Sequence, residues 1–529
     1  MTANEGSTRA TGLVRAGILL SAAFLVSRGL GYLRTVVVGT TFGAGPELDD
    51  FFAAFRLPDL IFQVAAAGAM GSALIPVLAG LLASGDRAHA WRVVATVTNL
   101  LLVALSVLAI AAFIAAPLLV RVLAPGYDAA GLARTTELTR IMLVAPIFLA
   151  LGAVATSTLH AEGRFTAAAL APIVYNIAII GGAVLLGPTM GVTGLAIGVV
   201  VGALGQVAIQ LPTMLGLGFR PMLRIDLQDK AARRVLALLG PRALGLGASQ
   251  FTFIVMTALA SSLGSGAVSA YTIAFALLQI PIGVVGVPLG VVIFPSISRE
   301  HALGAIESYV ALVTRSVRLL VFVMVPVAAI GIALRAPVVE LLFGYGKFDA
   351  ADIDRTAATL AAFLLGLPAH AAIAILARAF YARQNTRTPV LAAIFAVVVN
   401  TALGFLFVGS LGLPGLALAI AIAAWLEAGV LLVALGRHVP TFEPGSILRV
   451  LAESTIAAAI GAGIAIVVAA ALDSLVAPGS AKLAILAGTT VATAVGGVAF
   501  LLVAVVLRIP ELPSIVGLVT DQIRGRRRS

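Results

Sequence analysis

Cysteine is absent from this 529-residue chain, and charged residues make up only 11% of it. The lack of cysteine excludes disulfide bonds, thiol catalysis and cysteine-ligated metal. A soluble domain of ordinary composition carries about 25% charged residues, so an aqueous globular protein is excluded as well. Hydrophobic residues account for 61% of the sequence. This excess indicates a protein that crosses a membrane many times.

Residues that serve in common catalytic and metal sites are few and scattered. No two of the five histidines have the i, i+4 spacing of a zinc-binding helix; they are His89, His160, His301, His370 and His438. The segment Gly344–Lys347 lacks the spacing of a P-loop, and no Walker motif occurs. No Ser/His/Asp or paired-carboxylate arrangement emerges. We therefore predict no catalytic residue, no metal site and no cofactor, and direct use of ATP is disfavoured.

Fourteen apolar stretches of about 20 residues or more, the length that a membrane-crossing helix needs, divide the sequence. They lie at 16–40, 51–83, 92–116, 138–159, 167–187, 191–217, 236–263, 268–296, 310–334, 356–379, 389–410, 412–436, 449–472 and 481–507. We expect an all-α integral membrane protein with fourteen transmembrane helices. No small-residue cleavage site closes the first stretch, so we interpret it as a retained helix rather than a signal peptide.

The net charge of +11 comes from basic residues that lie mainly in alternate loops, so it does not require a nucleic acid partner. Basic residues concentrate in every second loop, including 87–92, 220–234 and the terminal segment 524–528. Because loops rich in arginine and lysine stay in the cytoplasm, the sequence predicts that both termini are cytoplasmic. Membrane lipid is the expected surrounding partner.

An internal repeat is visible at an offset of about 220 residues. Gly191–Ala196 recurs as Gly412–Ala417, and Asn176 recurs as Asn400. Shared composition would align alanine, leucine, glycine and valine with anything, but proline, aspartate, arginine and asparagine also recur in register, which indicates a duplication. Each copy holds six apolar stretches, so the copies are parallel. In transporters of this kind the substrate site lies near mid-membrane between the halves.

The repeat and the loop charges together predict five parts. These are an N-terminal six-helix lobe (1–217), a basic cytoplasmic linker (218–235), a C-terminal six-helix lobe (236–438), two additional transmembrane helices (439–507) and a basic cytoplasmic tail (508–529). We expect the tail to contact anionic headgroups.

Two arginines, Arg28 and Arg34, lie inside the first apolar stretch. An arginine near the middle of a membrane helix costs about 2.5–3.5 kcal/mol even on the scale that gives the lowest values. The pair therefore predicts a hydrated cavity that accepts an anion. The matching part of the second copy, residues 247–294, has no Asp, Glu, Lys, Arg or His, so we expect the first copy to bind the charged part of a substrate.

Structural roles are open alternatives for these charges. Arg28 could be paired with an acid such as Asp49 or Asp59, and Arg34 could extend to the membrane surface. Arg56 could line the same cavity or pair with Asp59. Asp49 and its acidic neighbour could complement a helix N-terminus through its dipole or act as a gate or counter-charge to the arginines.

The second copy carries one deep carboxylate, Glu427, in the twelfth apolar stretch. It could bind a coupling cation, although pairing with a neighbouring polar group is favoured.

Several separated blocks of the sequence resemble the MurJ (MviN) family. They are Ser27–Gly31 with Arg34, Phe42–Gly45, Asp49–Pro58, Tyr345–Phe348, Phe380–Gln384 and Thr388-Pro389. Members of that family flip lipid II, the undecaprenyl-pyrophosphate-linked peptidoglycan precursor, and belong to the multidrug/oligosaccharidyl-lipid/polysaccharide exporter superfamily. The resemblance covers roughly residues 15–440.

The resemblance implies two six-helix lobes plus a C-terminal helix pair in the bacterial cytoplasmic membrane. It also implies transport of a polyprenyl-pyrophosphate-linked glycolipid by alternating access, with cell-wall synthesis proteins as candidate partners. Carried over by position, the family's substrate-binding residues correspond to Ser27, Arg28, Arg34, Asp49 and Arg56.

Three positions depart from the family pattern. Phe62 and Ala276 stand where the family often has arginines, and Thr35 stands where it often has an acid. These departures keep open a flippase for another polyprenyl-linked oligosaccharide, of the O-antigen or capsule type. A cation-coupled drug exporter is disfavoured because the charged residues of the first copy are net basic. A membrane scaffold with structural arginines is the third alternative.

Overall fold

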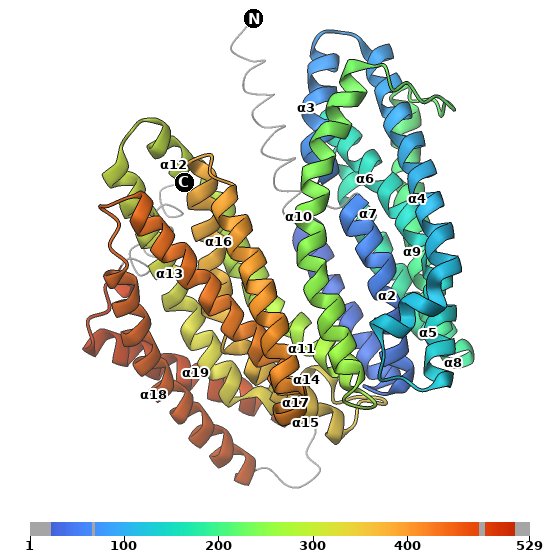
Figure 1. Ribbon diagram of the computed structural model, residues 1–529. Coiled ribbons are helices and arrows are strands. Elements are labelled where there is room, and N and C mark those ends of the chain that lie inside the picture. The colour runs from blue at the N-terminus through green and yellow to red at the C-terminus, as the bar shows by residue number, and fades with distance from the viewer. Residues whose placement is uncertain (1–22, 66–68, 476–481, 514–529) are drawn as a thin grey trace, which may run out of the picture. The chain divides into compact units, whose positions relative to one another are not determined.

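The computed structural model describes residues 23–65, 69–475 and 482–513. Helices joined by turns and loops form this described part of the chain, and it contains no strand (Figure 1). The predicted all-α class is therefore confirmed. The beginning of the first apolar stretch and most of the basic tail lie outside the described residues.

The first of two compact units runs through Ser269 and includes residues 346–348. It contains the helical segment 23–42 and α2 (Pro46–Ala65), α3 (Ala69–Ala83), α4 (Arg87–Leu123), α5 (Ala129–Met142), α6 (Ala145–Ala161), α7 (Thr166–Gly181), a π-helical turn η1 (Gly182–Leu186), α8 (Gly187–Met190), α9 (Val192–Gly216) and α10 (Lys230–Ser261). Helix α9 packs on α6 and α7, and α2 packs on α5 and α10. Leucine, valine, alanine and phenylalanine side chains fill these interfaces.

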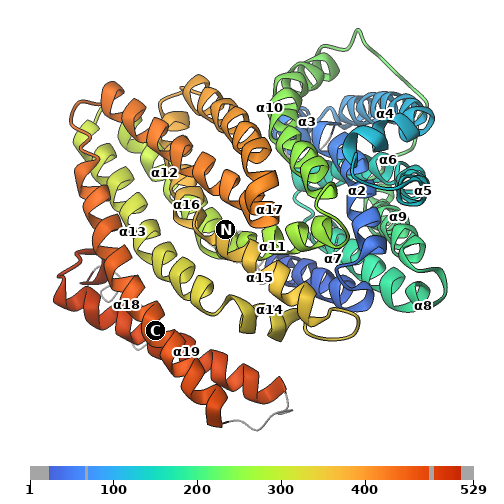
Figure 2. The ribbon, with the colours of Figure 1, turned by 60° about the horizontal axis from the view of Figure 1, so that its bottom comes forward.

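The second unit holds most of the remaining chain. Its helices are α11 (Ala267–Pro281), the π-helical turn η2 (Ile282–Gly286), α12 (Val287–Ala302), α13 (Ile306–Ala333), α14 (Arg335–Phe343), α15 (Ala350–Leu364), α16 (Leu367–Ala382), α17 (Arg387–His438), α18 (Gly445–Leu475) and α19 (Lys482–Val506). Helix α13 packs on α16 and α18, and α18 packs on α19 (Figure 2).

Within the described residues, nine helical stretches are long and apolar enough to cross a membrane. They become ten if α15 and α16, which are bent by 43° at the short break between them, form one span. Helix α17 has 52 residues, and Gly412 interrupts it with a non-helical backbone, so it consists of two helices. The chain is a multi-pass membrane protein, and the number of fourteen crossings stays a prediction.

The division into compact units differs from the predicted lobes at α10. This helix packs against α2, α3 and α4, and so the first unit extends to Ser269, whereas the predicted second lobe begins at residue 236. The sequence boundary follows the repeat, and the unit boundary follows packing. The five-part division therefore stays a prediction.

Backbone details recur at positions that the repeat pairs. Gly191 has φ 58° and ψ −142°, and Gly412 has φ 60° and ψ −139°, a conformation that side chains with a Cβ rarely adopt. Asp128 and Asp349 are also separated by the repeat offset of about 220 residues. The side chain of Asp128 accepts a hydrogen bond from the backbone N–H of Gly131 at the start of α5, and Asp349 caps α15 in the same way. The two copies thus share local geometry that sequence similarity alone does not establish.

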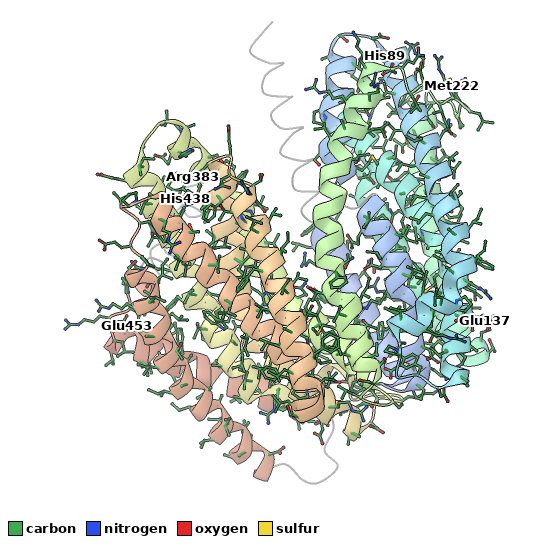
Figure 3. The ribbon with its side chains drawn as sticks, viewed as in Figure 1. His89, Glu137, Met222, Arg383, His438 and Glu453 are labelled. Carbon is green, nitrogen blue, oxygen red and sulfur yellow. The ribbon has the colours of Figure 1, made fainter. Side chains whose placement is uncertain are left out.

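The linker between α9 and α10 is attached to α4. The side-chain amide of Asn99 donates hydrogen bonds to the carbonyl oxygens of Met222, at 2.5 Å, and Arg224, at 3.0 Å. His89 Nε2 lies 2.6 Å from a carboxylate oxygen of Asp229, whose other oxygen caps the N-terminus of α10. His89 and Met222 accordingly lie at the same end of the first unit (Figure 3).

Candidate functional site

The two arginines of the first helix point to different faces of it. Six residues separate Arg28 from Arg34, which in an α-helix is about 9 Å along the axis and about 120° around it. Ser27, seven residues before Arg34, lies on nearly the same face as Arg34. The side-chain amide of Asn176 on α7 approaches the carbonyl oxygen of Ser27 at 3.5 Å. The Ser27–Arg34 face is therefore turned towards α7.

Arg34 lines a cavity of about 270 Å³ inside the first unit. Asp59 from α2, Tyr175 from α7 and Gln206 from α9 line the same cavity, together with apolar residues that include Phe62. Within the described part of the chain, Arg34 forms no ion pair with a carboxylate. Arg34, the hydroxyl of Tyr175 and the amide of Gln206 can donate hydrogen bonds to an anion from several sides, whereas the carboxylate of Asp59 opposes its charge.

Arg28 is turned away from this cavity and contacts residues of its own helix. Its Nε lies 3.4 Å from the hydroxyl oxygen of Tyr32, and its guanidinium lies 5.8 Å from the centre of the Phe24 ring. No salt bridge joins Arg28 to an acid among the residues that the structure describes. The alternative in which Arg28 is paired with Asp49 or Asp59 is thus not what the structure contains.

Arg56 and Asp59 lie on the side of α2 that faces α10. Arg56 Nε donates a hydrogen bond to Thr257 Oγ1 at 3.0 Å, and its guanidinium lies 5.4 Å from the centre of the Phe253 ring. Gln250 donates to a carboxylate oxygen of Asp59 at 3.2 Å. These contacts join α2 to α10, and they also hold Asp59 at the border of the Arg34 cavity.

Asp49 is buried, with 2% of its surface exposed. One carboxylate oxygen accepts a hydrogen bond from the N–H of Gly266, and the other accepts two from Ser269, one from the N–H and one from the hydroxyl. Asp49 thus complements the N-terminus of α11, which is one of the roles that the sequence allowed for it. Its role in substrate binding stays a prediction.

Asp50 is equally buried and is paired differently. Its carboxylate accepts hydrogen bonds from Arg134 at 2.7 Å and from Thr135 at 3.1 Å. Both residues are on α5, so this acid ties α2 to its neighbouring helix.

Sequence reasoning passed over three polar residues within apolar stretches. Tyr175 and Gln206 line the Arg34 cavity. Arg378 on α16 donates to the carbonyl oxygen of Ala374 at 2.6 Å and packs against Gly290 of α12. A search for every polar residue inside the fourteen stretches would have found them, because such residues are rare and costly in a membrane.

Polar and charged side chains around a cavity inside a bundle of long apolar helices are typical of a membrane transporter. The fold matches that of a solved structure titled "Lipid II flippase MurJ, inward closed conformation", with a TM-score of 0.76, 23% identity and coverage of 93% of this chain and 98% of that one. It also matches a multidrug resistance MATE family transporter of the MOP superfamily, with a TM-score of 0.68, 18% identity and coverage of 81% and 98%.

The family described as "Lipid II flippase MurJ" matches residues 38–506. A Lipid II flippase MurJ of Burkholderia cenocepacia is 32% identical over 434 residues, which are 80% of this chain and 84% of that protein. A probable lipid II flippase MurJ of Rhizobium tropici is 32% identical over 479 residues, or 89% and 90%. The chain belongs to the MurJ family. It is a transporter rather than an enzyme, and the predicted resemblance is confirmed.

Proposed function

We propose that this protein moves lipid II across the bacterial cytoplasmic membrane for peptidoglycan synthesis. The relatives that match over most of the chain are named for that activity. The observation within the chain that carries the proposal is Arg34, a cation without a carboxylate ion-pair partner among the described residues, which lines a cavity inside the first bundle.

The proposed mechanism is alternating access of two lobes. The pyrophosphate and sugars enter a hydrated cavity and contact arginines, while the polyprenyl chain stays in the lipid. The planar guanidinium donates two parallel hydrogen bonds to a phosphate, and these contacts offset the loss of hydration. In this proposal Ser27, Arg28, Arg34 and Arg56 contact the headgroup or position the residues that do, and Asp49 holds the helix geometry around them. Both termini lie in the cytoplasm, and cell-wall synthesis proteins are candidate partners.

The test is complementation of a bacterial strain depleted of its own lipid II flippase. We expect the wild-type chain to restore growth and lipid II translocation. The Arg34→Ala variant should lose translocation at a normal membrane level, and Arg34→Lys should keep part of it. Normal translocation by Arg34→Ala would remove this residue from the mechanism, and failure of the wild-type chain to translocate lipid II would reject the function.

Phe62 favours a second candidate function, a flippase for another polyprenyl-linked oligosaccharide. It lines the same cavity as Arg34, so an apolar side chain stands where a second cation would contact the headgroup. Translocation of lipid II and of an O-antigen-type lipid should be compared in the same vesicles. A faster rate for the second substrate would favour this candidate.

A further inference from the structure

A second group of arginines lies in the second unit, far along the sequence from the predicted substrate residues. Arg318 from α13, Arg449 from α18 and Arg508, just after α19, line a cavity of about 410 Å³. The one acidic side chain that lines it is Glu453. We name this space the arginine cavity.

Two of its arginines are held in place by carboxylates. Arg318 Nε and Nη2 both donate to one oxygen of Glu511, and Arg449 Nε donates to Glu453 at 2.6 Å. These pairs leave Nη1 of Arg318 and both Nη groups of Arg449 without a bond to another described residue. The carboxylates therefore position the guanidinium groups and leave several N–H donors for a ligand.

Arg508 has an unusual backbone conformation that places its side chain at the cavity. Its φ is +55°, in the left-handed region. The N–H of Arg508 bonds to the carbonyl of Val505, and the N–H of Ile509 bonds to that of Ala504, the pattern of a helix end that normally takes glycine at this position. The chain carries arginine here in spite of the conformational cost, and the side chain has no bonded partner within the described residues.

The start of α18 adds to the positive potential of this place. Ser446, in the first turn of this 31-residue helix, lines the arginine cavity. A helix N-terminus attracts anions through its dipole and its free N–H groups. Three arginines, a hydroxyl and a helix N-terminus are the chemistry of a phosphate site.

We propose that the arginine cavity binds a phosphate group. The surroundings favour the headgroup of an anionic phospholipid over a soluble phosphate. Leu448, next to Arg449, is 54% exposed, and Val506, two residues before Arg508, is 79% exposed. These side chains offer an apolar surface to the acyl chains of a lipid. Basic pockets between the ends of transmembrane helices bind anionic lipids in this way. An adjoining cavity of about 540 Å³ is lined by two arginines and three glutamates, so the anion site is confined to the arginine cavity.

The experiment uses the full-length purified chain in phosphatidylcholine nanodiscs that contain increasing fractions of phosphatidylglycerol. Lipids retained in native mass spectrometry and the thermal unfolding midpoint are measured. We expect retained phosphatidylglycerol and a raised midpoint. The Arg508→Gln variant should bind about fivefold more weakly, the loss expected for about one basic residue near anionic lipid. Arg508→Lys should keep most of the binding.

Two further variants keep the result interpretable. Arg508→Gly suits the left-handed backbone, so it should fold at least as well as the wild type and still lose binding. Arg437→Gln removes an exposed arginine at the end of α17 that does not line the cavity, and it should bind normally.

A second arm adds inorganic phosphate to nanodiscs that contain phosphatidylcholine alone. A rise in the midpoint that Arg508→Gln abolishes would assign the site to a soluble phosphate, and arginine-dependent binding of phosphatidylglycerol would assign it to lipid. If neither probe binds, or if Arg437→Gln weakens binding as much as Arg508→Gln does, the proposal is overturned.

Discussion

The carboxylate of Asp49 accepts hydrogen bonds from both the backbone N–H and the hydroxyl of Ser269, 220 residues further along the chain. A third bond comes from the N–H of Gly266. With 2% of its surface exposed, this acid connects α2 to the segment that begins α11. A residue that sequence comparison marks for the substrate thus has a structural task that only the fold reveals.

Replacing Asp49 should therefore affect folding first. The Asp49→Ala variant leaves two buried N–H groups without acceptors, and each unsatisfied buried group costs about 1–3 kcal/mol. We expect a lower thermal unfolding midpoint and less folded protein in the membrane, measured by fluorescence-detected size-exclusion chromatography with heating. Asp49→Asn retains one acceptor oxygen, which can serve Ser269 or Gly266 but not both, and its midpoint should fall between those of the wild type and Asp49→Ala. An unchanged midpoint combined with lost transport would instead assign Asp49 to the substrate.

The paired glycines Gly191 and Gly412 test the repeat at the level of the backbone. Both have φ near +60°, and a Cβ would meet no close contact at Gly412 and only an ordinary one at Gly191. Substitution by alanine should therefore cost conformational strain alone, about 1–3 kcal/mol at each site. We expect similar losses of the unfolding midpoint for Gly191→Ala and Gly412→Ala.

The matched control for this pair is Gly409→Ala. Gly409 lies in the helix three residues before Gly412 and also has open space around its Cβ position, so alanine there should be neutral or slightly stabilising. Equal effects at Gly409 and Gly412 would contradict the strain argument.

The acid that caps α10 gives a pH dependence. Burial raises the pKa of Asp229, but the hydrogen bonds from Ala232 and His89 outweigh it, so that the pKa lies below its ordinary value of 3.8. A depressed pKa stabilises the folded state above the ordinary value, and the contribution is lost as the pH falls through the folded pKa. Asp229→Asn keeps the cap but removes the charge. Its deficit in unfolding free energy should be full at pH 6 and should shrink below about pH 4. A constant deficit would show that the charge does not matter.

Much of the fold follows from the order of apolar and polar residues. Long apolar runs must form helices in a membrane because each backbone polar group needs a partner that lipid cannot supply, and so the all-α class and the approximate helix positions were predictable. The division at Ser269 was not, because it depends on the packing of α10 against α2, α3 and α4.

The sequence by itself determined the membrane class, the duplication and the presence of unusual cations, since these depend on composition and on spacing along the chain. Only the tertiary structure decided which charges are satisfied. It placed Arg34 at a cavity with Asp59, Tyr175 and Gln206. It also placed Asp49 against Ser269 and brought Arg318, Arg449 and Arg508 around one cavity. The physical reason is that a charge is stabilised or left available by neighbours within a few ångströms. For Asp49 and Arg318 those neighbours come from residues far apart in sequence.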